Sequence, residues 1–413
     1  MEKYTLIRPE AIYCPDKRIV EHGTVVLVGG KRIVRVGSDR SLRNGILKQV
    51  NPDSLQQIDL PGHYLMPGLC NSHVHLSFSA TSETLSDYLS ESEMIQGIRA
   101  AVNAGIMLRS GVTTVRDAGS GDFLIPVIQL ADKGFMKLPK LIFCGAPLTV
   151  TRGHCYFMGG EADGPEAVRA AVHRRKSLGA SALKIMASGG NLTPGTKPEE
   201  PSYSQEELDA AVREAGKLGM PTLAHCLSSQ SILRAARAGV DCIDHCGFLV
   251  RDDRGRLARR YDEDVALELR DSGSFITMSL GLVHRLEAIR LKKNRSEAEE
   301  FQLEQERLRL EIFARLVDLG IKPVVGTDTG VPNTSFRETF LELLYMTKAG
   351  LSAEDAIEAA TRSAVRAMGL GDTIGRIAPG CAADLIAVPG NPVEDISRLS
   401  EVDWVMAEGE IVD

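Results

Sequence analysis

Eight short apolar runs, each followed by a longer stretch of helical periodicity, constrain the fold of this chain more than any other feature. The runs cover residues 65–73, 112–117, 141–145, 182–187, 221–225, 242–245, 275–280 and 323–328. Strands that alternate with helices form parallel sheets covered by those helices. Eight such pairs predict an α/β protein whose main part, residues 63–375, is a (β/α)8 TIM-type barrel.

The two ends of the chain differ from this pattern, because both consist of short strand-like segments separated by turns. These segments are residues 4–7, 23–28, 32–36 and 57–60 at the N-terminus, and 383–388 and 404–406 at the C-terminus. The 413 residues are enough for a barrel of about 250 residues and a second unit. We therefore expect residues 1–62 and 376–413 to form one small β-sandwich domain.

Two of the expected helices begin at a serine that is followed by an acidic residue three positions later. Ser204 and Glu207 open a helix over 204–218, and Ser352 and Asp355 open one over 352–368. The segment 284–319 is long and densely charged, with Glu interleaved with Arg and Lys. This spacing favours a solvated helix pair with i,i+4 ion pairs, and we assign no chemistry to it.

Residues suited to metal binding or catalysis stand at or near the ends of five of the eight runs. They are His73, His75, Lys184, His225, His245 and Asp328. Side chains two apart on a strand point to the same face, so His73 and His75 can bind one metal ion. The carboxyl ends of barrel strands meet on the face that carries the active site. A lysine in an apolar strand is costly to bury as a cation, so Lys184 indicates a function or a charge that is removed.

These residues, in this order, resemble the motif set of the amidohydrolase superfamily. The likeness continues at both ends of the predicted barrel, in LMPGL (65–69) and GRIAPGCAADL (375–385). Within the superfamily the chain resembles binuclear metallo-dipeptidases of the Xaa-Pro and Xaa-Arg type. The motifs that carry this closer likeness are TTVRDAG (113–119), Gly153-His154 and LKIMASGG (183–190).

The resemblance implies a role for each of these side chains. Lys184 would be carboxylated by CO₂ and would bridge two divalent metal ions, most often zinc. His73 and His75 would hold one ion together with Asp328, and His225 and His245 would hold the other. A metal-bridging hydroxide would attack a carbonyl carbon, and Asp328 would carry its proton to the leaving group. The catalytic candidates are accordingly Asp328, His245 and His154.

Other positions near the expected site have less definite roles. His154 follows the third run and is expected either to contact substrate or to serve as a structural loop histidine. Arg116 and Asp117 end the second run, where we expect a buried ion pair. The dipeptidases carry a tyrosine two residues after the third histidine, but this chain has Leu227 there, so the group that polarises the carbonyl is unassigned. The loop 329–336 also lacks the histidine often found after the aspartate.

We therefore expect an enzyme that hydrolyses the C–N bond of an N-acyl amino acid, a dipeptide or a related amide. His154, Arg116 and the loop 152–153 are the candidates for contact with a substrate carboxylate. The alternatives are a deaminase or ring-opening enzyme, or a lactone or carbamate hydrolase, of the same superfamily, and a scaffold without catalysis. Mononuclear deaminases generally lack the bridging lysine and often place a glutamate near the third histidine, whereas residues 226–230 contain no carboxylate.

Composition limits the partners of such an enzyme. With 48 basic and 55 acidic side chains the net charge is −7, which gives no basic footprint for nucleic acid. We find no stretch apolar enough to span a bilayer and no signal-peptide core, and the eight cysteines are scattered. We expect a cytoplasmic protein that acts on a small molecule without binding nucleic acid or membrane, and the family likeness implies a homo-oligomer.

Overall fold

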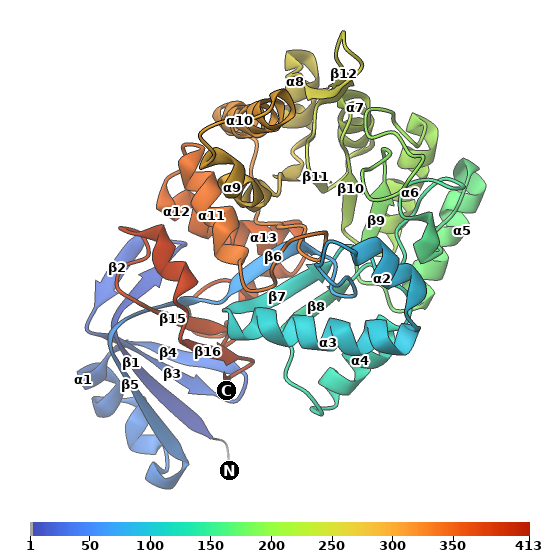
Figure 1. Cartoon of the computed structure of the whole chain (residues 1–413). Coiled ribbons are helices and arrows are strands. Elements are labelled where there is room, and N and C mark those ends of the chain that lie inside the picture. The colour runs from blue at the N-terminus through green and yellow to red at the C-terminus, as the bar shows by residue number, and fades with distance from the viewer. Residues whose placement is uncertain (1–2) are drawn as a thin grey trace.

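The computed structural model describes residues 3–413, so Met1 and Glu2 of the expected N-terminal segment lie outside the described residues. Figure 1 shows two parts: a β unit, in which blue N-terminal and red C-terminal strands lie together, and a larger α/β body. The strands of the β unit are β1 (Tyr4–Cys14), β2 (Ile19–His22), β3 (Thr24–Gly29), β4 (Arg32–Ser38), β5 (Leu55–Pro67), β15 (Leu385–Pro389), β16 (Trp404–Ala407) and β17 (Glu410–Val412).

These strands form one sheet in the order β17-β16-β15-β5-β1-β3-β4, with β2 paired to β1. The two chain ends meet where β15 runs antiparallel to β5, with Leu385 opposite Pro67. We expected a sandwich, and the structure has a single sheet that curls, because Arg32 of β4 bridges Ala382 just before β15. The curl encloses an apolar cluster that includes Ile7, Val26 and Leu385.

The α/β body holds seven short parallel strands in two sheets. They are β6 (Leu69–Val74), β7 (Val112–Asp117) and β8 (Lys140–Phe143) in one sheet, and β9 (Leu183–Met186), β10 (Thr222–His225), β11 (Cys242–Asp244) and β14 (Phe275–Thr277) in the other. A parallel bridge between Leu148 and Ile185 joins the two sheets on one side. The order of the strands is the order of the predicted runs.

The eighth run is not a regular strand, contrary to prediction. Residues 323–328 make one parallel bridge to β14, at Pro323, and Asp328 donates its backbone N–H to the carbonyl of His73 in β6. Proline has no N–H to give a ladder, and Asp328 has a left-handed backbone with φ of 58°. The run therefore lies between β14 and β6 with only isolated bonds to each.

The first run is divided between the two parts of the molecule, which the sequence did not indicate. Its first residues end β5 in the terminal sheet, and β6 begins at Leu69. Gly68 stands at the junction, where a Cβ atom would lie 2.8 Å from Cβ of Thr113. Only glycine allows the chain to pass this close to β7.

Helices cover the outside of the body. They are α2 (Thr84–Ser90), α3 (Glu93–Arg109), α4 (Leu124–Asp132), α5 (Gly164–Ser177), α6 (Gln205–Lys217), α7 (Ser229–Ala238), α8 (Glu263–Ser272), α9 (Glu287–Arg290), α10 (Glu297–Asp318), α11 (Thr339–Lys348), α12 (Ala353–Ala359) and α13 (Arg362–Ala367). Smaller elements are α1 (Asp39–Asn44), the 3-10 helices η1 (Ile46–Gln49), η2 (Pro52–Ser54), η3 (Tyr156–Met158), η4 (Leu280–Leu286), η5 (Gly371–Thr373) and η6 (Ile396–Ser400), and the hairpin strands β12 (Leu249–Arg251) and β13 (Leu257–Arg259).

The helix signals are confirmed at their starts, but one predicted helix is broken. The capping box of Ser204 and Glu207 is fully formed at α6. The helix expected over 352–368 is two helices, α12 and α13. The carbonyls of Ala359 and Ala360 accept hydrogen bonds from the backbone N–H groups of Val325 and Cys70, and so are not available for the next helical turn.

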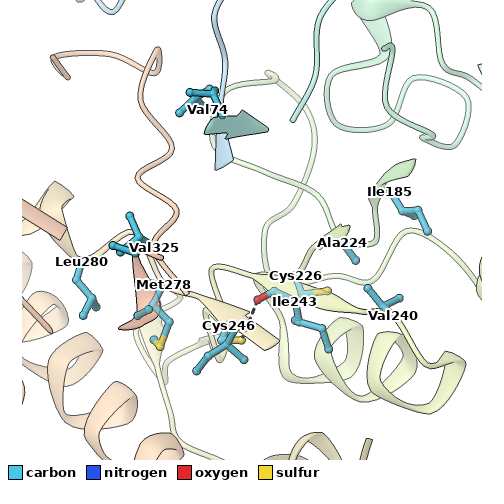
Figure 2. Close-up of a cluster of buried hydrophobic side chains, with 14 of the residues drawn as sticks. Val74, Ile185, Ala224, Cys226, Val240, Ile243, Cys246, Met278, Leu280 and Val325 are labelled. Carbon is cyan, nitrogen blue, oxygen red and sulfur yellow. Dashed lines mark hydrogen bonds between the residues drawn. The ribbon is translucent and has the colours of Figure 1, made fainter. Parts of the chain in front are cut away.

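Apolar side chains fill the space between strands and helices. Figure 2 shows part of this core, which includes Ile185, Ala224 and Ile243 from three neighbouring strands together with Cys226 and Cys246. All eight cysteines are buried and free. Within residues 3–413, no helix is both long and apolar enough to cross a membrane.

Candidate metal centre

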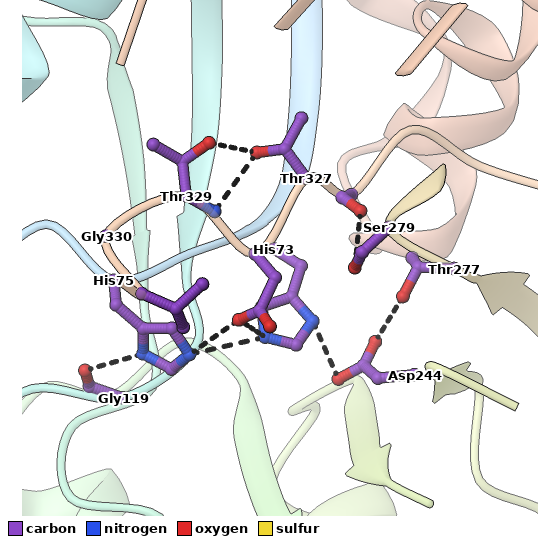
Figure 3. Close-up of polar contacts among 12 residues, drawn as sticks. His73, His75, Gly119, Asp244, Thr277, Ser279, Thr327, Thr329 and Gly330 are labelled. Atoms are coloured by element: carbon purple, nitrogen blue, oxygen red, sulfur yellow. Dashed lines mark hydrogen bonds and ion pairs between the residues drawn. The ribbon is translucent and has the colours of Figure 1, made fainter. Parts of the chain in front are cut away.

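Three ligand atoms converge where β6 ends. Nε2 of His73 lies 3.4 Å from Nε2 of His75, and Oδ1 of Asp328 lies 3.4 Å from the first nitrogen and 3.3 Å from the second. Figure 3 shows the rings of His73 and His75 side by side at this point. Among the described residues these three form a group whose ligand atoms all lie within 4.8 Å of one another. The spacing of two residues brings the rings of His73 and His75 to the same side of the chain, as expected for residues two apart on a strand.

An oxygen atom lies next to the opposite nitrogen of each of three imidazoles. Nδ1 of His75 lies 3.2 Å from the carbonyl of Gly119, Nδ1 of His73 lies 3.2 Å from Oδ2 of Asp244, and Nε2 of His225 lies 3.0 Å from the carbonyl of Gly189. An oxygen that fixes one nitrogen sets the ring tautomer and leaves the lone pair of the other for a metal ion. This pattern of partners fits a metal-binding site.

Five of the nine histidines form a continuous row of rings along the strand ends. The ring centroids are 5.3 Å apart for His75 and His73, 5.1 Å for His73 and His245, 4.6 Å for His245 and His225, and 4.7 Å for His225 and His154. The predicted ligands His225 and His245 therefore adjoin the group of three without belonging to it.

Electrostatics keeps these side chains in the state that binds cations. Burial lowers the pKa of His245 to about 3, although the negative charge of Asp328 acts in the opposite direction. Burial likewise lowers the pKa values of His73 and His225. Burial alone would raise the pKa of Asp328, but the adjoining histidines hold it well below its ordinary value. These shifts favour the neutral imidazoles of His73, His225 and His245 and the charged carboxylate of Asp328, the states in which such groups bind metal ions.

Lys184 is buried in β9, as predicted, and has a partner that the sequence analysis missed. Its Nζ makes a close ion pair with Oδ2 of Asp244, the residue before His245, and both side chains are almost fully buried. Oδ1 of Asp244 accepts a hydrogen bond from Thr277 at 3.0 Å. The available signal was an aspartate placed directly before a strand-end histidine.

Several residues at the strand ends have a left-handed backbone conformation, which residues other than glycine seldom adopt. They include His245 with φ of 70°, Ser279 with φ of 50° and Asp328 with φ of 58°. Such conformations cost of the order of 1–3 kcal/mol each and concentrate at functional sites. Here they turn each chain segment at the point where its side chain reaches the site.

His154 enters the site from the loop after β8, and a glycine makes room for it. A Cβ atom on Gly190 would lie 2.6 Å from Cδ2 of the His154 ring and still closer to Cε1 and Nε2. Nδ1 of His154 is buried without a hydrogen-bond partner among the described residues. Burial lowers the pKa of His154 to about 3. Gly190 therefore serves close packing of this ring, whereas a Cβ atom on Gly189 would meet the backbone of Lys197.

The expected ion pair between Arg116 and Asp117 is absent from the described contacts. Arg116 donates to the backbone carbonyls of Ser72 and Ala367, at 2.7 and 3.1 Å. Asp117 accepts from the N–H of Leu76 at 2.9 Å, and burial raises its pKa. Consecutive residues of a strand point to opposite faces, so the two side chains cannot meet. Arg116 is fully buried and does not line the cavity, and Arg152 is exposed outside it.

A cavity of about 430 Å³ opens above the histidine row. Its lining includes five predicted histidines with Lys184 and Asp328, together with apolar side chains such as Phe78, Met186 and Leu227. The charged segment 284–319 also lines it, through Arg285, Leu286, Glu306 and Arg309. This corrects the interpretation of that segment as a purely solvated surface, although exposed ion pairs such as Arg307 with Glu304 are present.

The comparisons identify the family of the chain. The Amidohydrolase family model matches residues 64–412, so the chain belongs to that family. The chain is 26% identical to the ochratoxinase of Aspergillus niger over an alignment of 433 residues. This alignment covers 97% of this chain and 84% of the ochratoxinase. The crystal structure of that ochratoxinase superposes with a TM-score of 0.83 at 25% identity, covering 100% of this chain and 96% of the other.

Two solved structures of peptidases are also similar. A Xaa-Pro dipeptidase with methionine in its active site has a TM-score of 0.84 at 28% identity, with 99% of each chain covered. A prolidase complexed with N-methylphosphonate-L-proline has a TM-score of 0.83 at 27% identity, with 100% of each chain covered. These likenesses establish an α/β TIM-type barrel with an extra domain. The chain is a hydrolase that acts on C–N bonds of small substrates, in a superfamily whose members generally use divalent metals.

Proposed function

We propose that the enzyme hydrolyses an amide or peptide bond whose leaving amine carries an amino acid-like carboxylate. The substrates would be N-acyl amino acids, dipeptides or related amides. The observation that carries this proposal is the convergence of His73, His75 and Asp328 in the cavity of a chain from this family. The names of the similar proteins, a dipeptidase and a prolidase among them, support the peptide-like substrate.

We propose two zinc ions as the metals of this site. His73 and His75 would hold one ion together with Asp328, and His225 and His245 would hold the other. When bound, such ions lower the pKa of water and polarise a substrate carbonyl. Both contacts of Asp328 use Oδ1, which leaves Oδ2 to accept a proton and return it to the leaving nitrogen as general acid. His154, with its unpartnered Nδ1, would contact the substrate.

We propose that the Lys184 amine, after its ammonium has lost one proton to solvent, adds to CO₂ with loss of a second proton, and that the resulting carbamate would help to hold both ions. In the structure, Nζ of Lys184 makes an ion pair with Asp244, and both side chains are buried. A buried charge at this position is costly unless an opposite charge lies beside it. The carbamate changes the sign of the charge on Lys184, so we propose that Asp244 then remains with Nδ1 of His73, 3.2 Å away.

The remaining features of the protein are proposals as well. We propose that the body, residues 63–375, is a barrel in which the irregular eighth run closes the ring between β14 and β6, with residues 1–62 and 376–413 as the β domain. We also propose a cytoplasmic homo-oligomer. Helix α3 supports association, because its outer face exposes Met94 (75%), Ile98 (61%) and Val102 (54%) at a spacing of four residues.

A substrate comparison with the zinc-loaded protein tests the function. N-acyl amino acids and dipeptides are assayed beside a lactone, a carbamate and an aminopyrimidine. We expect hydrolysis of the amides to have the highest kcat/KM. A clear preference for the lactone or the aminopyrimidine would assign the chain to the other chemistries of its superfamily.

A further inference from the structure

Three arginines from separate elements stand on one wall of the cavity. Arg259 ends β13, Arg285 lies in η4, and Arg309 lies in α10. The acidic residues that line the same cavity are Glu306 and Asp328. The sequence analysis assigned a role to none of the three arginines, because two of them fall in the charged segment 284–319.

Each arginine is fixed by one N–H group to the backbone of a loop at the strand ends. Nη1 of Arg259 donates to the carbonyl of Gly247 at 2.8 Å, Nη1 of Arg285 to that of Pro332 at 2.7 Å, and Nη1 of Arg309 to that of Ser279 at 3.2 Å. A guanidinium has five N–H donors, so each keeps several for another partner. The three groups are oriented before any ligand arrives, which lowers the entropic cost of binding.

The charges on this wall do not balance. Arg309 pairs with Glu306 at 3.1 Å. Arg259 and Arg285 have no ion pair within residues 3–413, and Nε of Arg259 is buried without a hydrogen-bond partner. Burial, and then the charge of Arg309, lowers the pKa of Arg259 to about 9. Arg259 is partly buried, whereas Arg285 is exposed. A partly buried cation without a partner is costly, so the position of Arg259 favours an anion, and Arg285 adds positive charge to the same cavity.

We infer that Arg259 and Arg285 bind the carboxylate of the substrate's leaving group and so select amides of amino acids over neutral amides. This inference rests on the proposed function and names the part of the site that reads the carboxylate. A guanidinium matches a carboxylate with two parallel hydrogen bonds. Arg309 is held by its ion pair with Glu306 and does not itself bind the carboxylate in this proposal. The neighbouring side chains Leu249, Leu282 and Leu286 offer an apolar surface to the rest of the leaving group.

A purely structural role makes a different prediction. If the arginines only hold the loops through Gly247 and Pro332, their removal weakens hydrolysis of every substrate alike. If they bind a carboxylate, their removal acts on the substrates that carry one. The ratio of kcat/KM between an N-acyl amino acid and its carboxamide therefore separates the two roles.

The test uses Arg259→Gln, Arg285→Gln and Arg259→Lys in the full-length, zinc-loaded protein. The matched control is Arg307→Gln, on α10 two residues before Arg309, where the side chain is exposed, pairs with Glu304 and lies outside the cavity. For each glutamine variant we expect the kcat/KM ratio to fall by about 10- to 100-fold, the value of one charge-assisted contact. Arg259→Lys should recover part of the ratio, and Arg307→Gln should leave it unchanged.

A binding titration tests, independently of turnover, whether the two arginines bind a carboxylate. Calorimetry compares N-methylphosphonate-L-proline with its carboxamide on each variant, with urea midpoints as the check of folding. Weaker binding of the carboxylate form alone, in Arg259→Gln and Arg285→Gln, supports the anion site even if the wild type hydrolyses no amide, in which case only the proposed function fails. Equal binding of the two forms by the wild type, or equal losses for both forms in the variants, would overturn the inference.

Discussion

Replacement of Gly190 by alanine should displace His154, and the structure sets the size of the effect. The added Cβ would lie 2.6 Å from Cδ2 of His154, whereas carbon atoms pack best at about 3.5–4.0 Å. The ring would have to move by about 1 Å, and it is buried against His225, with 4.7 Å between ring centroids. Overpacking of this kind costs about 1–3 kcal/mol. We expect Gly190→Ala to lose stability in this range and also to lose kcat/KM.

A double-mutant cycle isolates the contact. Urea unfolding is measured for Gly190→Ala, for His154→Ala and for the combination. Removal of the ring leaves space for the new methyl group, so the loss caused by Gly190→Ala should shrink to about 0.5 kcal/mol or less in the His154→Ala background. An unchanged loss in that background would show that the glycine is needed for some other reason and that the packing argument is wrong.

Three further substitutions test the site and its surroundings. Lys184→Met should fold but lose bound metal and nearly all turnover; metal analysis that matches the wild type would make Lys184 a structural residue. Asp328→Asn should lower kcat by about 10² or more, since general acid–base catalysis is typically worth 10²–10⁴, and a rate within a few-fold of wild type would exclude it as proton carrier. Burial raises the pKa of Glu342 to about 7, so its contribution to stability is present below about pH 4.5 and lost as pH rises through 7. Glu342→Gln should therefore gain stability over the wild type as pH rises from 5 to 8; urea midpoints that differ equally at all pH values would contradict this.

The sequence predicted the positions that depend on local pattern. The ends of the predicted strands and the alternation of side chains located His73, His75 and Asp328. Residues at the carboxyl ends of parallel strands come together on one face of the barrel. The signals at Ser204 and Glu207 are similarly local, and the capping box is present.

Features that depend on tertiary contacts were not predictable in this way. The break between α12 and α13 arises because the carbonyls of Ala359 and Ala360 accept hydrogen bonds from Val325 in the eighth run and from Cys70 in β6. The irregular eighth run reflects Pro323 and the left-handed Asp328. Arg285 and Arg309 were hidden in a charged segment, since a sequence of alternating charges does not show which side of a helix faces a cavity.

The most direct measurement is of metal content and amide hydrolysis in the same preparation. The protein is stripped with a chelator, titrated with zinc, and analysed at each step for bound metal and for hydrolysis of an N-acyl amino acid. We expect no hydrolysis without metal and a rise in parallel with zinc up to two ions per chain. Full hydrolysis by the metal-free protein, or no hydrolysis of any amide at two bound ions, would contradict the assignment of this site.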